Sequence, residues 1–303
     1  METWLTKAAF FHMQNYSDLN GGEKYGEIRG EERSASCARH DYARNCERRI
    51  PCDWRWRRRQ VCKSAGRSFI RNVWPGWRLK LGIYDTVRTA SMITNAVLVG
   101  FSGGKDSVAC LDLCFRYFKR VQPYFMYYIP GLEFQERTLR WYESKYETEI
   151  IRIPHFELSS FLRYGTFRNY DLSVPIVKTA EAYNYLREKT GIYWIAAGER
   201  IADSIVRRAM IKESSTIDEK RGRFYPIAHF NKAEILAYNK AQKLPVSEES
   251  RVLGFSFRSL APRDMLAIKR AYPSDFEKIK AFFPLIEASV KFWEIHEQRN
   301  QPN

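Results

Sequence analysis

The spacing of hydrophobic residues changes along the chain, and it is most regular after residue 92. Four short apolar runs, at residues 96–101, 124–129, 149–153 and 192–197, have the length and composition of buried strands. Segments of helical periodicity lie at residues 107–118, 134–147, 178–190, 231–243, 263–271 and 274–296. Strands that alternate with helices predict an α/β fold, with an open, mostly parallel, twisted sheet, helices on both faces and a helical C-terminal extension.

Residues 1–91 show no such periodicity, and their composition differs from that of the rest. They hold 18 Lys and Arg residues against 10 Asp and Glu residues, and they contain five of the eight tryptophans. We expect this basic segment to be disordered or to lie outside the native fold, with Met92 as a natural start of the folded part. We expect the remainder to form a domain at 92–260 and a helical extension at 261–303 packed on that domain.

The chain carries a formal net charge of +15, which favours phosphate-bearing partners such as nucleotides or nucleic acid. A surplus of lysine and arginine is equally compatible with a surface that is simply kept soluble. No apolar run approaches the length that crosses a bilayer, and the first residues lack the apolar core of a signal peptide. We therefore expect a cytoplasmic protein that has no membrane partner.

A glycine-rich loop, GFSGGKDS at residues 100–107, separates the first predicted strand from the first predicted helix. It differs from the Walker A pattern, because the glycine spacing is one residue short and Asp106 follows the lysine. Gly103 and Gly104 still permit a tight turn whose N–H groups converge on an anion, and Lys105 adds a positive charge. A carboxylate beside a phosphate indicates a metal, so Asp106 is a candidate Mg²⁺ ligand. The predicted phosphate site comprises Ser102, Gly103, Gly104, Lys105, Asp106 and Ser107.

The stretch SGGKDS after a buried strand resembles the PP-loop of the ATP pyrophosphatase superfamily. The resemblance implies an adenine nucleotide alpha hydrolase-like fold with ATP and Mg²⁺ as cofactors. It also implies cleavage of ATP between the α and β phosphates, followed by an adenylylated acceptor.

Two segments further along are similar to the phosphoadenosine phosphosulfate (PAPS) reductase-like branch of that superfamily. GERIADSIVR at 198–207 is similar to the branch's segment with a glycine, two arginines, an acidic residue and a serine. The stretch at 225–247 resembles its Pro-Ile, aromatic, acidic, Tyr, Pro pattern. The resemblance extends from about residue 95 to residue 290.

These segments add residues to the predicted site. Arg200 and Arg207 present forked donors that suit phosphate or sulfate, although an arginine-rich helix face balanced by Asp203 and Glu199 is the alternative. The predicted catalytic residues are Lys105, Asp106, Arg200 and Arg207. The predicted nucleotide-binding residues outside the loop are Gly131, Gly198 and Arg200, and the fold of the family implies that Gly131 lets an adenine lie against the backbone.

The cysteines depart from the pattern of the branch. PAPS reductases use a cysteine near the C-terminus as the nucleophile on sulfur, and this chain has none after Cys114. The stretch GFSFRSLAPRD at 254–264 lacks the two cysteines that many relatives carry there. Cys110 and Cys114 are spaced to meet on one helix face, either as a thiol pair or as core residues.

Three functions follow as hypotheses. The first is ATP cleavage that adenylylates an unidentified acceptor, in sulfur transfer or nucleic-acid modification, and the positive charge favours an anionic one. The second is a sulfonucleotide reductase that uses a thiol of a protein partner or of the cysteine pair. The third is a nucleotide-binding regulator without turnover. The basic run DWRWRRR at 53–59 is either a nucleic-acid contact or part of a disordered tail.

Overall fold

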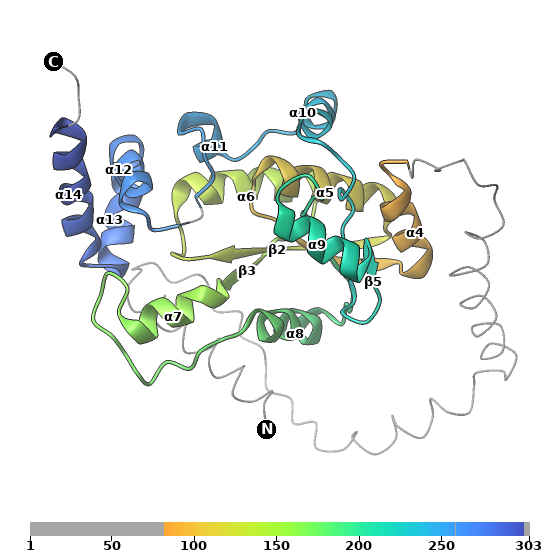
Figure 1. Cartoon of the computed structure of the whole chain (residues 1–303), viewed down its shortest axis with the longest axis horizontal. Helices are drawn as coiled ribbons and strands as arrows, with labels where there is room; N and C mark the ends of the chain where they lie inside the picture. Colours follow the sequence, from red (N-terminus) through yellow and green to blue (C-terminus); the bar gives the residue numbers. More distant parts are fainter. Residues whose placement is uncertain (1–81, 258, 300–303) are drawn as a thin grey trace, which may run out of the picture. The chain divides into compact units, whose positions relative to one another are not determined.

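A six-stranded sheet lies at the centre of the described part of the chain, residues 82–257 and 259–299 of a computed structural model (Figure 1). The strands are β1 Ala96–Gly100, β2 Arg120–Tyr127, β3 Ile151–Pro154, β4 Ile195–Ala196, β5 Ile217–Asp218 and β6 Arg223–Phe224. Their order is β3-β2-β1-β4-β6-β5, and every neighbouring pair is parallel except β5 with β6. The predicted α/β class with a mostly parallel sheet is therefore confirmed.

Strand β1 occupies the position where the strand order reverses. The chain continues from β1 to β2 and β3 on one side, and it returns to β4 on the other side. In open α/β sheets, ligands bind outside the carboxyl ends of the strands at such a switch point. The loop that follows Gly100 is therefore at the place where the topology favours a ligand.

Helices α4 (Asp85–Ile93), α5 (Lys105–Tyr117) and α6 (Glu133–Tyr146) share a buried apolar core with one face of the sheet. Val97 and Val99 project from β1 into this core, because alternate residues of a strand point to opposite faces. Helix α10 (Lys232–Ala241) packs on the far side of α5 through a smaller apolar cluster.

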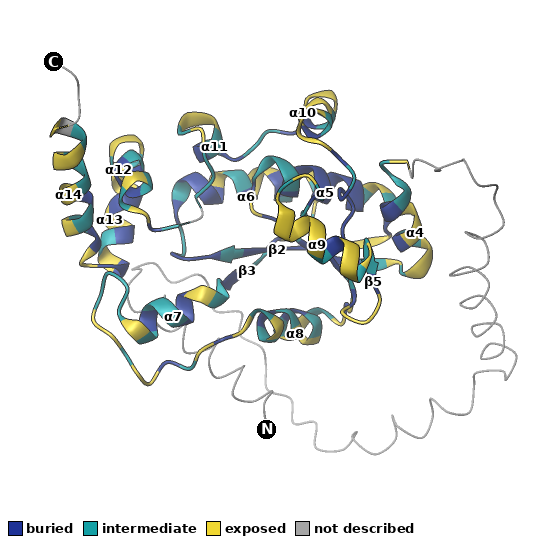
Figure 2. Cartoon of the chain, viewed as in Figure 1, coloured by how far each residue is buried: buried dark blue, intermediate teal, exposed yellow. Residues whose placement is uncertain are grey.

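The opposite face of the sheet is covered by α7 (Phe156–Tyr164) and α8 (Thr179–Thr190), so helices lie on both faces (Figures 1 and 2). Leu98, Tyr124 and Ile153 supply the strand side of this core. The same core includes apolar residues of the C-terminal helices, which are α12 (Pro262–Ala271), α13 (Pro273–Phe282) and α14 (Ile286–Arg299). Within the described residues, no helix combines the length and apolarity needed to span a bilayer.

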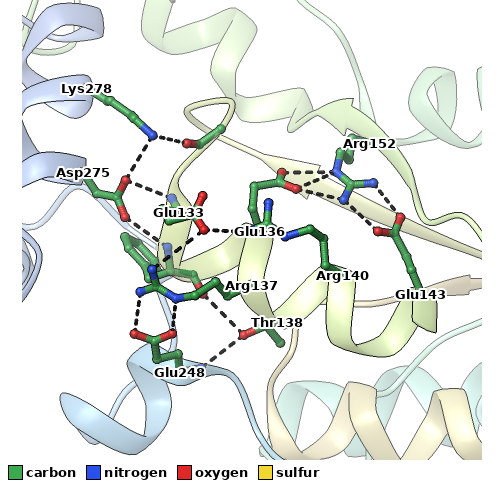
Figure 3. Close-up of polar contacts among 12 residues, drawn as sticks. Glu133, Glu136, Arg137, Thr138, Arg140, Glu143, Arg152, Glu248, Asp275 and Lys278 are labelled. Atoms are coloured by element: carbon green, nitrogen blue, oxygen red, sulfur yellow. Dashed lines mark hydrogen bonds and ion pairs between the residues drawn. The ribbon is translucent and has the colours of Figure 1, made fainter. Parts of the chain in front are cut away.

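Polar contacts join α6 to the C-terminal region (Figure 3). The buried Asp275 carboxylate accepts the N–H groups of Glu133 and Phe134 at 2.9 and 3.0 Å, so a residue of α13 satisfies donors at the start of α6. Arg137 makes a bidentate contact of 2.7 Å in each arm with Glu248 of the short helix α11 (Glu248–Val252). These contacts fix the residues around 248 relative to α6.

The structure changes the predicted elements in three places. The helix predicted at 274–296 is two helices, because Pro284 lacks an N–H and cannot continue α13. The strand predicted at 192–197 pairs only at Ile195–Ala196. Helix α4 crosses the predicted boundary at Met92, and its residues Val87 and Ala90 are buried in the core. The predictions on residues 1–81, including the basic run, lie outside the described residues.

Candidate functional site

The loop between β1 and α5 makes a turn that requires glycine. Gly103 has a φ of 72°, in the left-handed region that favours glycine. A Cβ at this position would lie 2.9 Å from the Cβ of Ser247, and the Gly103 carbonyl accepts the N–H of Ser247 at 2.8 Å. The turn is thus held closely against the residue that precedes α11.

The first turn of α5 has no side-chain cap, because the N-cap residue is Gly104. Two hydroxyl groups stabilise the loop from within. Ser107 Oγ accepts from the Ser102 N–H at 3.2 Å and from Ser102 Oγ at 3.1 Å, and it donates to the Gly104 carbonyl at 3.0 Å. An uncapped helix N-terminus behind a glycine turn suits an anion, since its N–H groups and dipole favour negative charge.

A chain of alternating charges extends from the loop to α9 (Ile205–Ser214). Lys105 Nζ lies 2.5 Å from Asp106 Oδ2, and Arg200 Nε lies 2.9 Å from Asp106 Oδ1. Arg200 Nη2 is 2.5 Å from Asp203 Oδ1, and Arg207 Nη1 is 2.8 Å from Asp203 Oδ2. All four predicted catalytic residues are therefore brought together, with Asp203 as the link to Arg207.

The contact between Asp106 and Arg200 is close but poorly aligned. Asp106 Oδ1 and Arg200 Nε are buried and make no hydrogen bond of acceptable geometry with any described group, so we treat the contact as Coulombic. A carboxylate oxygen with unused lone pairs fits a divalent cation. Among the residues that the structure describes, no three His, Cys, Asp or Glu side chains cluster as metal ligands. Phosphate oxygens would therefore have to complete the coordination of a Mg²⁺ ion at Asp106.

Gly198 brings the arginine segment close to the loop. A Cβ at Gly198 would lie 3.6 Å from the Asp106 carbonyl carbon and from the Ser107 nitrogen. The segment that carries Arg200 thus contacts the backbone at the start of α5. These distances are ordinary van der Waals contacts, so the segment packs directly against the loop.

A pocket of about 310 Å³ lies beside the loop, at the carboxyl ends of β1 and β2. Its wall includes the rings of Tyr128, His155 and Phe257, and the ring centroids of Tyr128 and His155 are 4.6 Å apart. Burial lowers the pKa of His155, although nearby Glu157 opposes this effect, so the imidazole is mainly neutral at neutral pH. The remaining lining residues are Gly100, Phe101, Ser102, Tyr124, Phe125, Met126 and Gln135. Flat walls with few polar groups suit a planar heterocycle.

Gly131 is not among the described residues that line this pocket. It forms a turn with a φ of 67° between β2 and α6, and its carbonyl accepts from Lys278 Nζ at 2.7 Å. A backbone contact between Gly131 and an adenine stays a prediction.

Cys110 and Cys114 are fully buried in the core between α5 and the sheet. Burial raises the pKa of the Cys114 thiol, and the neighbouring Cys110 raises it further. A thiol that is buried and protonated is a poor nucleophile. The arrangement favours the core role over the thiol pair.

Three residues of the site lack a recognisable motif in the sequence. Ser247 is the last residue of the stretch at 225–247, and Ser256 and Phe257 lie beyond it. All three reach the loop or the pocket only through the fold. The only features of the sequence that mark this region are Gly254 and the serines at 247, 250 and 256. Neither signal specifies a partner in the glycine loop, which is far away in the sequence.

The chain is similar, at low sequence identity, to several solved structures. A PAPS reductase from Candida auris, in a phosphate complex, is 16% identical, with 59% of this chain and 88% of that chain covered and a TM-score of 0.42. The U34-tRNA thiolase NcsA from Methanococcus maripaludis, with its 4Fe-4S cluster, is 16% identical, with 78% and 79% covered and a TM-score of 0.38. An NH3-dependent NAD synthetase from Campylobacter jejuni, in complex with a nitrate ion, is 15% identical, with 73% and 95% covered and a TM-score of 0.37.

No curated protein matches the chain significantly in sequence. The model of the phosphoadenosine phosphosulfate reductase domain matches residues 96–248, which is half of the chain. This range contains the loop, the arginine segment and all the residues that line the pocket except Phe257, and it ends one residue after Ser247. The chain therefore belongs to the phosphoadenosine phosphosulfate reductase domain family.

Proposed function

We propose that this protein binds ATP with Mg²⁺, cleaves it between the α and β phosphates, and transfers the adenylyl group to an acceptor. The observation that carries the proposal is the position of the uncapped N-terminus of α5. It lies between an aromatic pocket on one side and the Lys105–Asp106–Arg200 charge chain on the other.

The loop would hold the β and γ phosphates. Gly103 and Gly104 leave the N–H groups accessible, and Lys105 contributes a cation beside them. Ser102 and Ser107 keep the turn in shape through their shared hydrogen bond. The adenine would occupy the pocket between Tyr128, His155 and Phe257, and Gly131 and Gly198 remain predicted backbone contacts.

Asp106 is the proposed ligand of Mg²⁺, which when bound would neutralise charge on the phosphates. Without a ligand, Lys105 and Arg200 both contact this carboxylate. Once phosphate oxygens compete for these cations, Lys105 can turn toward the β and γ phosphates and Arg200 toward the α phosphate. Arg207 is about half exposed and can exchange Asp203 for an anionic group on the acceptor.

In the proposed reaction, a lone pair of the acceptor forms a bond to the α-phosphorus. The bond from that phosphorus to the bridging oxygen breaks, and its electron pair leaves with pyrophosphate. The acceptor's proton passes to solvent or to a base of the acceptor complex. The chain contributes mainly by positioning and by electrostatic stabilisation of the transferring group.

The acceptor that we propose is anionic, such as a sulfonucleotide or nucleic acid, because the chain carries a net charge of +15. Sulfonucleotide reduction is the second candidate. Since the described cysteines are both buried, this reaction would need a thiol supplied by a protein partner.

Equilibrium binding of ATP in the presence of Mg²⁺ tests the proposed site. We expect Lys105→Ala to weaken ATP binding by about tenfold or more, because it removes a charge-assisted contact to phosphate. Lys240→Ala, on an exposed face of α10, is the matched control and should bind ATP like wild type. Equal binding by wild type, Lys105→Ala and Asp106→Ala would show that the site is wrongly assigned.

A further inference from the structure

Two hydroxyl groups from distant parts of the sequence converge over Gly104. A Cβ at Gly104 would lie 3.5 Å from Ser102 Oγ and 3.5 Å from Ser256 Oγ. Gly104 is the N-cap of α5, so both oxygens flank the place where an anion meets the helix N-terminus. Ser102 belongs to the loop, whereas Ser256 comes from the turn that follows α11.

A chain of hydrogen bonds leads from behind the loop to Ser256. Ser247 Oγ lies 2.8 Å from Ser250 Oγ, which lies 2.7 Å from Ser256 Oγ. Ser247 is itself buried and is tied to the Gly103 carbonyl through its N–H group. This series of hydrogen bonds therefore begins at Ser247, beside Gly103, and ends at Ser256, beside Gly104.

Each hydroxyl has one hydrogen to donate, so donation along the three serines can run in either of two directions. In one direction the hydrogens point toward Ser247, which contacts the buried carboxylate of Glu249. In the other direction Ser247 donates to Ser250 and Ser250 donates to Ser256, which leaves the Ser256 hydrogen for a group at Gly104. An anion bound at the loop favours the second direction, because it offers a charged acceptor at that end, whereas burial disfavours the charged form of Glu249 at the other end.

The buried Glu249 carboxylate holds the turn that carries Ser256. Burial raises the pKa of Glu249, and the N–H of Phe257 is one of the groups that oppose this effect by hydrogen bonding. Its Oε2 atom is buried and has no partner among the described groups. Phe257 lines the aromatic pocket, so one short turn reaches both the phosphate loop and the pocket.

We propose that Ser256 binds a phosphate oxygen of the nucleotide through its hydroxyl, and that Ser250 and Ser247 are positioning residues that direct this hydroxyl toward the loop. The proposal rests on the proposed function, since it assumes that ATP occupies the loop. It adds a phosphate ligand from outside residues 96–248, the range that the family model matches.

Binding of ATP and of adenosine, measured side by side, tests this role. We expect Ser256→Ala to weaken ATP binding by about tenfold and to leave adenosine binding unchanged, because adenosine has no phosphate. Ser256→Thr keeps the hydroxyl and should retain most of the ATP affinity. Ser250→Ala should weaken ATP binding by a few-fold, again without an effect on adenosine.

Two neighbouring variants serve as controls. Ser259 Oγ contacts Asp264 at 3.2 Å at the start of α12 and not the loop, so Ser259→Ala should bind both ligands like wild type. Phe257→Ala should weaken the binding of adenosine as well as ATP, because its ring lines the pocket.

The inference is wrong if Ser256→Ala binds ATP like wild type, or if it loses ATP and adenosine to the same extent. Thermal unfolding of each variant confirms that the fold is kept. Wild-type protein that does not bind ATP would overturn the proposed function itself, and the inference with it.

Discussion

Two clusters of charged residues in this protein differ in how completely their hydrogen bonds are made. On α6 and β3, the Arg152 guanidinium lies 2.8 Å from carboxylate oxygens of both Glu136 and Glu143, and each of its nitrogens has a partner (Figure 3). At the loop, Asp106 Oδ1 and Arg200 Nε are buried 2.9 Å apart without an aligned hydrogen bond.

The difference separates a structural cluster from a binding site. Buried polar groups in native proteins are nearly always paired, so a cluster with complete pairing stabilises the fold and has nothing left to bind. A cluster with unused donors and acceptors is incomplete until a ligand arrives. We infer that the Arg152 cluster stabilises the sheet edge, and that the Asp106 cluster binds phosphate and a metal ion.

Removal of the Arg152 guanidinium should have the largest effect on stability. Arg152→Ala leaves Glu136 and Glu143 close together without their cation, and we expect it to lower the free energy of unfolding by roughly 3 kcal/mol, at the low end for a buried pair because Arg152 is partly exposed. Urea denaturation measures the change. Arg140 is exposed and its partner Glu133 is about half exposed, so Arg140→Ala should cost less than about 1 kcal/mol. Equal losses in the two variants would show that the complete pairing of Arg152 adds no more stability than an exposed ion pair.

At the loop we expect a large effect on the reaction rate and a small effect on stability. Asp106→Asn keeps the shape of the side chain and removes the proposed metal ligand, so the rate of Mg²⁺-dependent ATP cleavage should fall by about 100-fold, or roughly 2.7 kcal/mol. Its free energy of unfolding should change less than that of Arg152→Ala. A variant that unfolds early but retains the wild-type cleavage rate would contradict the assignment.

The smallest effect concerns the pH dependence of stability. Burial raises the pKa of Glu143, but contacts with Arg152 and the Ile150 N–H outweigh this, so its pKa in the folded chain is below the ordinary value. Its stabilisation is therefore present above the ordinary pKa and is lost as the pH falls through the folded pKa. Glu249 shows the opposite shift, because burial dominates and raises its pKa.

The folded chain binds the proton of Glu249 more tightly than the unfolded chain does, so the contribution of this residue declines as the pH rises through its folded pKa. Unfolding free energies measured between about pH 2 and about pH 7 distinguish the two residues, because the Glu143 window lies below the ordinary pKa of a glutamate and the Glu249 window lies above it. Glu143→Gln should reduce the loss of stability toward acid. Glu249→Gln should reduce the loss toward neutral pH, and the same slope in both variants would refute these shifts.

Local features of the sequence predicted the fold well. Buried strands are continuous apolar runs, and the glycine turn before α5 is a short motif, so neither depends on the rest of the chain. Pro284 is equally local, and the split between α13 and α14 could have been predicted from it. Only Ile195–Ala196 of the predicted fourth strand pair with neighbours. Those neighbours are β1 and β6, and β6 is a two-residue strand without periodicity.

The candidate site was predicted only where its residues lie in motifs. Lys105, Asp106, Arg200 and Arg207 were identified by type and spacing, and the fold brings them into one charge chain. Ser256 reaches Gly104 through a contact that only the tertiary structure creates. A lone serine carries no signal of such a distant partner.

Exchange of labelled pyrophosphate into ATP, measured with Mg²⁺ across candidate acceptors, tests the central claim most directly. Reversible cleavage at the α-phosphorus predicts exchange with at least one acceptor, and it predicts that Lys105→Ala and Asp106→Ala abolish it while Lys240→Ala does not. Release of ADP and phosphate without exchange, or exchange that survives both loop variants, would contradict the account.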